Sequence, residues 1–506
     1  MTLLTHRMQS ETSAQNARSL GIAAALVLAI MALSIVARFP SLQMPVDRDI
    51  SAYATIGMRM THGELPYRDY FDHKQPLVYL VYWMLAEVAP RSNASIQLTA
   101  AFIAGMTGAL LFLLLRNELP MPRAFAVGCL AVTLGAARYV EGVDLNTEHL
   151  LLPFACAAVL VPYRYRNSPW RGLPILAGLL GGLAMMAKGV AVFILPAGVV
   201  VLVATRIRRS QSLPATLVSY GVGTIIPVGM LVAFYSLQGG LADLVYANVT
   251  YNSLYISQRP PPFLLEYGGV QTNSLLGASL FVGLVTLAKS KGRDLLAWVL
   301  ILWLGGSMLG AKMGRFDFPH YFAPTLPPAI TLLFLPLREG ALSSKRLVTS
   351  VVGVLIAAVS LPFVVDVALT FGRTPNWLAT RLYGEQAVIW TYQEEVGEWL
   401  RNVSGPTDTL FVAYAEPGFY WQSGLRPSTR FLYDFPLMVD ASAEEQLERA
   451  LSVTPPRFVV IPGDTIPPYL SFLSTIAYDE VAAFGPIHVL QERSSPEGLA
   501  GTKDAP

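Results

Sequence analysis

The sequence predicts an α-helical polytopic membrane protein that ends in a small α/β domain. Of its 506 residues, 53% are hydrophobic and only 14% are charged, and the mean hydropathy is +0.47; an average soluble chain carries about 25% charged residues. Apolar runs of roughly 16 to 24 residues recur, long enough for helices that cross about 30 Å of hydrocarbon. These features exclude a soluble enzyme, a disordered chain and a fibrous protein. A net charge of +2 also makes nucleic acid an unsuitable partner.

The first 19 residues form a polar tail that we expect in the cytoplasm. The apolar run after it has no small-residue cleavage site before Arg38, which indicates an uncleaved signal anchor. Eleven membrane-spanning helices are expected within residues 20–370, at 20–36, 96–115, 124–138, 148–163, 172–188, 190–205, 213–235, 274–288, 295–311, 322–337 and 347–370.

A shorter apolar stretch, 76–89, lies in the long loop 38–95 and is better placed in the membrane interface than across the bilayer. With the N-terminus inside and 76–89 not spanning, every inner loop carries at least two positive residues, as the positive-inside rule requires. These residues are Arg116 and Arg123, then Arg164, Arg166 and Arg171, then Arg206, Arg208 and Arg209, then Lys289, Lys291 and Arg293, and finally Arg338, Lys345 and Arg346.

Residues 371–506 contain no further run of membrane length, and short helical and strand-like segments alternate there. This alternation predicts a small α/β domain, and eleven crossings from an inside N-terminus put it on the extracytoplasmic side. The expected helices are 394–402, 444–451 and 468–476, and the expected strands are 409–413, 430–433, 457–461 and 488–491.

The loop 38–95 holds an unusual density of ionisable groups in PVDRDISAYATIGMRMTHGELPYRDYFDHKQP. Asp47 and Asp49 stand at the start of an expected helix, 50–62. Asp49 suits an N-cap, which accepts hydrogen bonds from free amides. A carboxylate there is equally suited to take a proton from a sugar or lipid hydroxyl, and both roles can coexist.

Asp72, His73 and Lys74 precede the interfacial stretch. Lys74 either extends to the lipid headgroups or binds a phosphate, because an ammonium neutralises the charge that grows on a departing phosphate. His73 suits a hydrogen-bonding loop residue better than a metal ligand.

Further charges are expected at the outer ends of the helices. Each could cap or complement a helix terminus, but charges at membrane depth also mark functional sites. They are Arg138, Glu141, Asp144, Glu148, Lys188, Arg259, Lys312, Arg315, Asp317 and His320. Phosphate loops, GxSxG, HExxH and dinucleotide motifs are all lacking in the sequence.

The segment RDISAYATIGMRMTHGELPYRDYFDHKQP resembles the first extracytoplasmic loop of the GT-C glycosyltransferases in the protein-mannosyltransferase-like group, which includes the bacterial aminoarabinose lipid A transferases. The resemblance extends in the same order through DLNTEHLLLPF (144–154), GLLGGLAMMAKG (178–189) and GRFDFPHYFAPTLPP (314–328). It covers roughly residues 20–370, and the trailing domain is similar to that of many bacterial members.

The resemblance implies a multi-pass glycosyltransferase of a bacterial inner membrane that uses a polyprenyl-phosphate-linked sugar. By position, Asp49 would be the catalytic base, and Asp47 remains a second candidate because many relatives have Asp-Glu where this chain has Asp49-Ile50. The resemblance implies a donor-binding role for Asp72, His73, Lys74, Glu148, Lys188, Arg315, His320 and Tyr321.

The implied reaction is an inverting transfer of a hexosyl or pentosyl group to a hydroxyl of an envelope lipid, glycan or protein. Phosphate is already a good leaving group, so fixed cations can replace the acid that a glycosidase needs. A divalent metal is therefore not required, although two or three carboxylates could bind one. The alternatives are a lipid-linked sugar flippase, a surface-glycan ligase or polymerase, and a non-catalytic assembly factor.

Overall fold

The computed structural model describes residues 2–208, 212–258, 269–316, 318–338, 346–474 and 476–493. Arg209, Arg259, Asp317 and Lys345 lie outside the described residues. The chain divides into two compact units. The first comprises Met1–Leu42, Ala94–Ala233 and Pro260–Arg373, and the second comprises Gln43–Asn93, Phe234–Arg259 and Thr374–Pro506.

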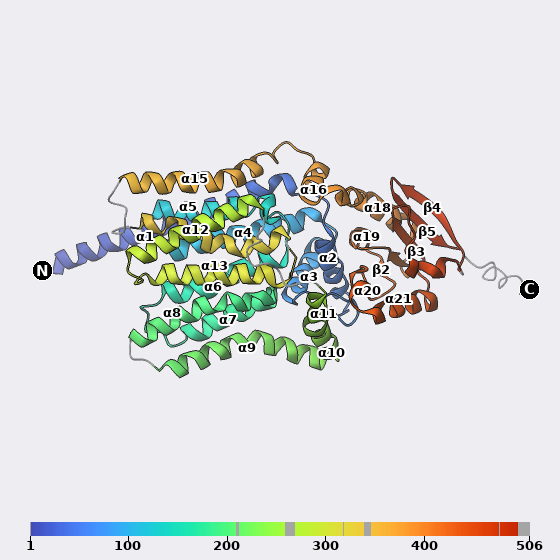
Figure 1. The fold of residues 1–506 in the computed structure, drawn as a ribbon, viewed down its shortest axis with the longest axis horizontal. Coiled ribbons are helices and arrows are strands. Elements are labelled where there is room, and N and C mark those ends of the chain that lie inside the picture. The colour runs from blue at the N-terminus through green and yellow to red at the C-terminus, as the bar shows by residue number, and fades with distance from the viewer. Residues whose placement is uncertain are drawn as a thin grey trace, which may run out of the picture. The chain divides into compact units, whose positions relative to one another are not determined.

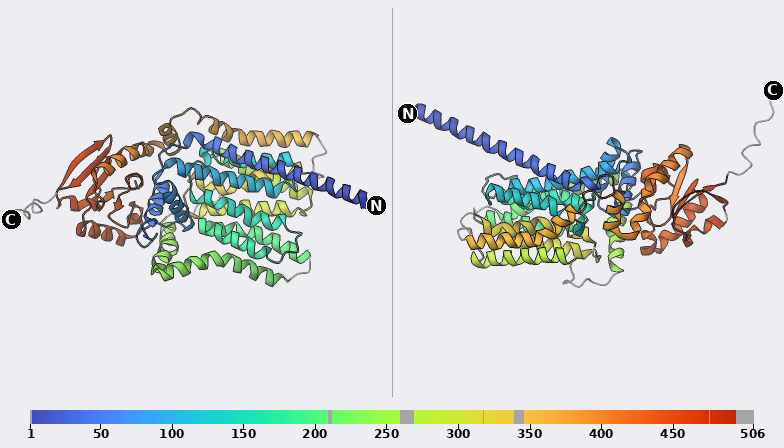
Figure 2. Two further views of the ribbon diagram at one scale, coloured as in Figure 1. Left: turned by 180° about the vertical axis from the view of Figure 1, so that it is seen from behind. Right: turned by 90° about the horizontal axis from the view of Figure 1, so that it is seen from above.

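The first unit is a bundle of helices, several of which lie side by side along most of their length (Figures 1 and 2). Its α-helices are α1 (Thr2–Arg38), α4 (Asn93–Leu115), α5 (Met121–Leu134), α6 (Thr147–Arg164), α7 (Leu173–Ala187), α8 (Leu195–Arg208), α9 (Leu213–Leu237), α12 (Val270–Lys289), α13 (Leu295–Met313), α14 (Leu326–Phe334) and α15 (Arg346–Ala368). Short 3₁₀ turns join them at η1 (Phe39–Ser41), η2 (Arg138–Val140), η3 (Gly189–Phe193), η5 (Pro319–Thr325) and η6 (Leu335–Leu337).

Each of the eleven apolar runs expected to cross the membrane contains one of these helices or overlaps it. In the described part of the chain, seven helical segments are long and apolar enough to span a bilayer. They are Arg18–Ser41, Asn93–Leu115, Gly189–Arg208, Leu213–Leu237, Val270–Lys289, Leu295–Met313 and Arg346–Ala368. The expected α-helical multi-pass fold is confirmed, while eleven crossings remain a prediction.

Glycines bring neighbouring helices of the bundle into backbone contact. A Cβ on Gly108 would lie 2.7 Å from the carbonyl oxygen of Gly128, and one on Gly182 would collide with that of Thr224. Small residues allow this close approach where lipid supplies no hydrophobic driving force. The glycines therefore set the spacing between α4 and α5 and between α7 and α9.

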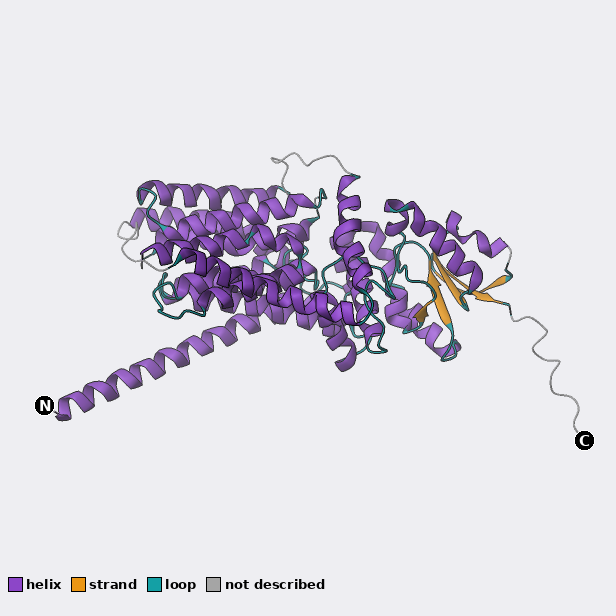
Figure 3. Ribbon diagram, turned by 90° about the horizontal axis from the view of Figure 1, so that it is seen from below, coloured by secondary structure: helices purple, strands orange, loops and turns teal. Residues whose placement is uncertain are grey.

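The second unit combines short helices with a β-sheet (Figure 3). Its helices are α2 (Arg48–Met60), α3 (Leu77–Val88), α10 (Leu241–Val245), the π-helix η4 (Tyr246–Tyr251), α11 (Asn252–Ser257), α16 (Pro375–Tyr383), η7 (Gly384–Gln386), α17 (Ala387–Trp390), α18 (Gln393–Val403), α19 (Gly418–Ser423), α20 (Phe435–Val439), α21 (Ala441–Val453) and η8 (Pro468–Ser474). Its strands are β1 (Thr409–Val412), β2 (Arg426–Pro427), β3 (Phe458–Pro462), β4 (Tyr478–Phe484) and β5 (Ile487–Glu492).

The five strands form one mixed sheet in the order β2-β1-β3-β5-β4. β1 pairs in parallel with β2 and β3, and β5 pairs antiparallel with β3 and β4. Every residue of β3 is buried, as expected for a strand at the centre of a sheet with covered faces. The small α/β domain expected from the sequence is thus present.

Two segments of this unit differ from the expectation. The expected strand 430–433 is wrong: its residues make one isolated bridge, between Phe71 and Phe431, and the strand of that region is β2. Local apolar residues resemble a strand there, but they fill the core beside the loop 38–95 instead, with Leu432 fully buried. Strand β4 was not expected at all, because its outer positions are exposed and lack the apolar alternation of a half-buried strand.

Helices α2 and α3 pack against each other and hold the loop between them. A Cβ on Gly57 would lie 2.5 Å from the backbone carbon of Tyr82, so only glycine permits this crossing. Tyr53 adds edge-to-face contacts with Tyr79 and Tyr82, at ring-centroid distances of 6.2 and 5.8 Å. The ionisable residues before α2 and α3 are therefore attached to a rigid support.

Candidate active site

Asp47 caps α2. Its carboxylate oxygen Oδ1 accepts a hydrogen bond of 2.7 Å from the backbone N–H of Ile50, and Asp47 is only 7% exposed. The expectation that Asp49 is the N-cap is therefore wrong, and the helix begins at Arg48 rather than at Ile50. The Asp47 side chain satisfies an amide that the first helical turn leaves free.

Asp49 lies in the first turn of α2, with its side chain 40% exposed. Its Oδ2 accepts a hydrogen bond of 3.1 Å from the ammonium of Lys74 and one of 3.2 Å from the hydroxyl of Tyr53. The spacing of four residues puts Tyr53 on the same helix face as Asp49. The structure thus brings together the expected base and the expected phosphate ligand.

Lys74 is held from its backbone as well as through its side chain. The hydroxyl of the fully buried Tyr67 donates a 2.7 Å hydrogen bond to the Lys74 carbonyl. Pro76, two residues later, is the N-cap of α3. The Lys74 side chain is only 16% exposed, so its ammonium is directed to Asp49 rather than extended freely into solvent.

Asp72 is buried behind this pair. Its Oδ1 accepts hydrogen bonds from the Tyr433 hydroxyl (2.7 Å) and from the backbone N–H of His73 (2.6 Å), whereas its Oδ2 has no hydrogen-bond partner among the described residues. Burial raises the pKa of the Asp72 carboxyl, although Lys74 opposes that shift. Burial and the adjoining Asp72 likewise raise the pKa of Tyr433 well above its usual value.

His73 lies against aromatic rings. Its ring centroid is 5.3 Å from those of Tyr251 and Tyr255, and its carbonyl accepts a 3.0 Å hydrogen bond from the amide of Asn252. The hydrogen bond is made by the backbone of His73, so a hydrogen-bonding role for its side chain stays a prediction.

In the first unit, a second cluster forms around Glu148, in the first turn of α6. Its Oε1 accepts a hydrogen bond from the ammonium of Lys188, the residue that ends α7. Its Oε2 accepts one of 2.7 Å from the hydroxyl of Thr147. The Nε2 of His320 lies 3.8 Å from Glu148 Oε1. Glu148 is 1% exposed, so the cluster neutralises a charge buried inside the protein.

η5 brings His320 and Tyr321 into this cluster. The Lys188 ammonium lies 4.2 Å from the centre of the Tyr321 ring, in cation–π geometry. The Nδ1 of His320 contacts Glu141 Oε2. Arg315 adopts a left-handed backbone conformation, with φ of 56°, just before η5. Four of the five donor-binding residues expected in this unit are thus joined by direct contacts.

Other charges of the first unit have structural partners. Asp366 forms an ion pair of 3.2 Å with Arg138, and Asp144 accepts a 2.7 Å hydrogen bond from Gln97. Within the described residues, no group of three or more His, Cys, Asp or Glu side chains is arranged to hold a metal ion.

Sequence reasoning missed two side chains next to these acids. Tyr53 was recognisable, because a tyrosine four residues after an aspartate shares its helix face. Tyr433 could not be recognised from the sequence. It lies 361 residues after Asp72, and no local pattern indicates a contact between residues so far apart.

Part of the chain matches a known protein family. Residues 73–234 match the family model of the dolichyl-phosphate-mannose-protein mannosyltransferases. None of the curated proteins compared with this chain matches it.

Among solved structures, ArnT from Cupriavidus metallidurans, bound to undecaprenyl phosphate, is 15% identical with a TM-score of 0.63, over 94% of this chain and 98% of that chain. Its apo form aligns with a TM-score of 0.58, at 15% identity, over 93% of this chain and 98% of that chain. The apo oligosaccharyltransferase from Archaeoglobus fulgidus aligns with a TM-score of 0.50, at 15% identity, over 87% of this chain and 69% of that chain.

The chain is a multi-pass α-helical protein whose fold is similar to that of ArnT. The family match over residues 73–234 and this fold together confirm the resemblance inferred from the sequence.

Proposed function

We propose that this protein is an inverting glycosyltransferase of a bacterial inner membrane. It moves a sugar from a polyprenyl-phosphate carrier to a hydroxyl of an envelope acceptor, on the extracytoplasmic face. The carrier class is supported by the similar fold of ArnT, which was solved with undecaprenyl phosphate bound. The observation that carries the proposal is the pair of Asp49 and Lys74, a partly exposed carboxylate in direct contact with a cation.

Asp49 is the proposed base. It is 40% exposed, whereas Asp47 is almost fully buried and occupied by the helix cap. A base must reach the proton that it removes, and Asp49 alone of the two carboxylates meets this condition. The acceptor oxygen, deprotonated by Asp49, attacks the anomeric carbon of the donor.

Lys74 is the proposed phosphate ligand. When the C–O bond to the carrier breaks, its electron pair stays on the phosphate, and the adjacent ammonium stabilises the added negative charge. The phosphate of the donor would compete with Asp49 for the same ammonium. Donor binding would then release Asp49 from its ion pair and make it available as the base, which couples proton removal to the presence of donor.

Glu148, Lys188, His320 and Tyr321 are proposed to bind the donor. The positive charge of Lys188 is neutralised by Glu148, so this group suits recognition of a polar sugar better than stabilisation of a leaving phosphate. Arg315 lies close in sequence to His320 and Tyr321, and we propose that it also contacts the donor.

The experiment is sugar transfer by purified protein in proteoliposomes, with a panel of radiolabelled polyprenyl-phosphate sugars and an extract of the host envelope. Wild type should transfer one of the sugars, and Asp49→Asn should lose the activity while still binding donor. Asp47→Asn is the matched control, since asparagine also caps helices well. It should keep most of the activity.

A wild-type rate for Asp49→Asn, at normal protein level, would overturn Asp49 as the base. A loss confined to Asp47→Asn would move the role to Asp47. Donor movement across the bilayer without transfer to any acceptor would instead establish a flippase.

A further inference from the structure

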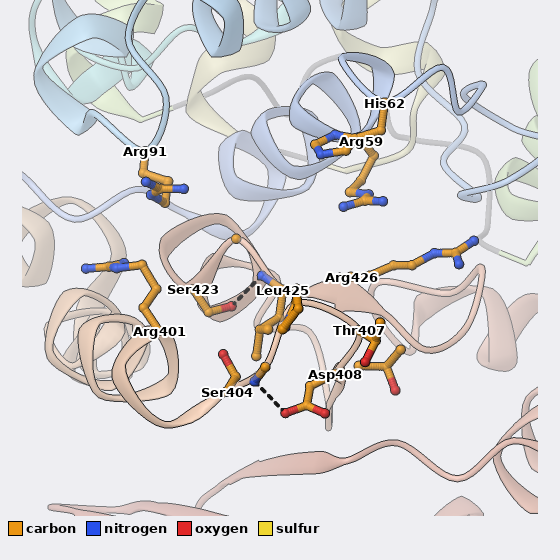
Figure 4. Close-up of a pocket in the computed structure, with 14 residues that line it drawn as sticks. Arg59, His62, Arg91, Arg401, Ser404, Thr407, Asp408, Ser423, Leu425 and Arg426 are labelled. Atoms are coloured by element: carbon orange, nitrogen blue, oxygen red, sulfur yellow. Dashed lines mark hydrogen bonds between the residues drawn. The ribbon is translucent and has the colours of Figure 1, made fainter.

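The second unit contains a cavity of about 670 Å³ that is rich in arginine and separate from Asp49 and Lys74. Four arginines and a histidine line it, together with the loop between α18 and β1 and the turn after α19. Arg91 and Arg401 are drawn on one side of the cavity and Arg59 and Arg426 on the other (Figure 4). Its volume is in the range of sites that hold small organic ligands.

Two of the four arginines, Arg91 and Arg401, have no acidic partner among the described residues, whereas the other two do. Arg59 and Arg426 both pair with Glu64, at 2.6 and 3.1 Å. Arg401 contacts a backbone carbonyl, that of Gln422, and Arg91 has neither a hydrogen bond nor an ion pair among the residues that the structure describes. Neither Arg91 nor Arg401 therefore has its charge balanced by a carboxylate in the described chain.

The adjoining cavity provides a contrast within the same unit. Its volume is about 710 Å³, and arginines also line it. The two cavities share Arg426, and each of the other arginines of this second cavity forms an ion pair with an acidic residue. Arg68 pairs with Asp69, Arg430 with Asp243 and Arg449 with Glu445. The arginines that line only the second cavity thus each have an acidic partner, unlike Arg91 and Arg401 of the first cavity.

The backbone around Arg91 is shaped to place its side chain in the cavity. Arg91 itself has a φ of 59°, a backbone conformation that is rare for residues other than glycine. Such residues are often found at binding sites. Gly424, with a φ of 72°, lies beneath it, and a Cβ there would come within 3.1 Å of the Arg91 guanidinium.

The acidic groups near the cavity do not pair with all of its arginines. Glu64 pairs with Arg59 and Arg426, and the Oδ2 of Asp408 accepts a 2.8 Å hydrogen bond from the backbone N–H of Gly405. Among the described residues, Arg91 and Arg401 carry positive charge that no ion pair balances, which suits the charge of about −1.5 to −2 on a phosphomonoester. Planar guanidinium groups suit the several oxygens of a phosphate.

We propose that this cavity binds a phosphomonoester group, carried by a phosphorylated sugar or by the headgroup of a lipid. Arg91 and Arg401 supply the unbalanced charge. Binding there needs no sugar transfer, so this proposal and the transferase reaction can fail independently.

The test is calorimetric binding of glucose 1-phosphate to the full-length protein in phosphatidylcholine nanodiscs. Arg91→Gln should weaken binding about tenfold or more, because it removes a charged hydrogen-bond donor. Asp408→Asn keeps an acceptor for Gly405 but removes an opposing charge, and it should strengthen binding about two- to threefold. Arg493→Gln, which changes an exposed arginine outside the cavity, should leave binding unchanged.

Glucuronate is the control for a carboxylate, and nanodiscs that contain phosphatidic acid distinguish the two sources of phosphate. Competition by phosphatidic acid would identify a lipid headgroup as the ligand, and its absence a soluble phosphate. The proposal is overturned if glucose 1-phosphate does not bind, if glucuronate binds as tightly, or if Arg91→Gln and Arg493→Gln bind equally.

Discussion

The ammonium of Lys74 donates a hydrogen bond to Asp49 Oδ2 at 3.1 Å, so the expected phosphate ligand and the expected base neutralise each other. The two residues are separated by 25 positions and are held by α2 and by the loop before α3. A donor phosphate would replace the carboxylate as the partner of Lys74.

Lys74→Gln should therefore weaken donor binding and reduce the transfer rate about 10²- to 10³-fold, since one fixed group that stabilises developing charge is worth that much. Lys74→Arg keeps the charge and should retain donor binding. Donor affinity in nanodiscs and single-turnover transfer measure both effects. Equal donor affinity in wild type and Lys74→Gln would contradict the role of Lys74.

Asp47 should act on stability rather than on chemistry. Asp47→Ala removes the acceptor of the Ile50 amide and should lower the free energy of unfolding by about 1 kcal/mol. Asp47→Asn should lower it by much less, because asparagine caps equally well. Thermal unfolding in detergent compares the variants, and equal losses for alanine and asparagine would show that the cap is not what Asp47 contributes.

Glu148 and Lys188 should be strongly coupled. Glu148→Gln or Lys188→Met alone leaves one charge without its partner in a site where Glu148 is 2% exposed at the side chain, and each should cost about 3 to 5 kcal/mol. The double variant should recover much of that loss. Unfolding free energies of the four proteins form a double-mutant cycle, in which additive losses would rule out the pairing.

Asp72 should make stability depend on pH. Its pKa is raised above the ordinary value of 3.8 in the folded protein, so its contribution is fully present below pH 3.8 and is lost as the pH rises through the higher folded pKa. Asp72→Asn cannot ionise, and its melting temperature should fall less than that of wild type between about pH 4 and about pH 7. Parallel melting curves for the two proteins over that range would contradict this assignment.

Gly57 should not tolerate a side chain. Gly57→Ala forces α2 and α3 apart, because the new Cβ would meet the backbone of Tyr82 at 2.5 Å, and it should destabilise the protein by about 1 to 3 kcal/mol. Gly221 in α9 has nothing within 4 Å of its Cβ position, so Gly221→Ala should be neutral or stabilising by about 0.5 to 1 kcal/mol. Matched thermal melts check the pair.

The helices were predictable because apolar runs bounded by charges carry their own signal, and the helix of each expected span lies within that run or overlaps it. Asp49 and Lys74 were recognisable because they stand at the starts of two helices. The sequence could not show which of Asp47 and Asp49 caps α2, because both residues suit the position and only the backbone geometry distinguishes them.

The contacts that sequence could not supply are those between distant segments. Tyr433 lies in a stretch whose apolar pattern predicts a strand, yet its hydroxyl donates a hydrogen bond to Asp72. The cation-rich cavity likewise draws Arg59, Arg91 and Arg401 from separate parts of the chain. No local period or motif connects such residues, because their proximity is a result of tertiary packing.

The hydrogen bond between Asp72 and Tyr433 has a consequence for biosynthesis. Its partners are 361 residues apart, and the second unit is assembled from three stretches of chain with helices of the first unit inserted between them. Asp72 is synthesised long before Tyr433, so this hydrogen bond cannot form until most of the helices have been made. Contacts between such distant residues form slowly, so Asp72 would gain its Tyr433 hydrogen bond only late in folding, whereas the contact between Asp49 and Lys74, 25 residues apart, needs no such delay.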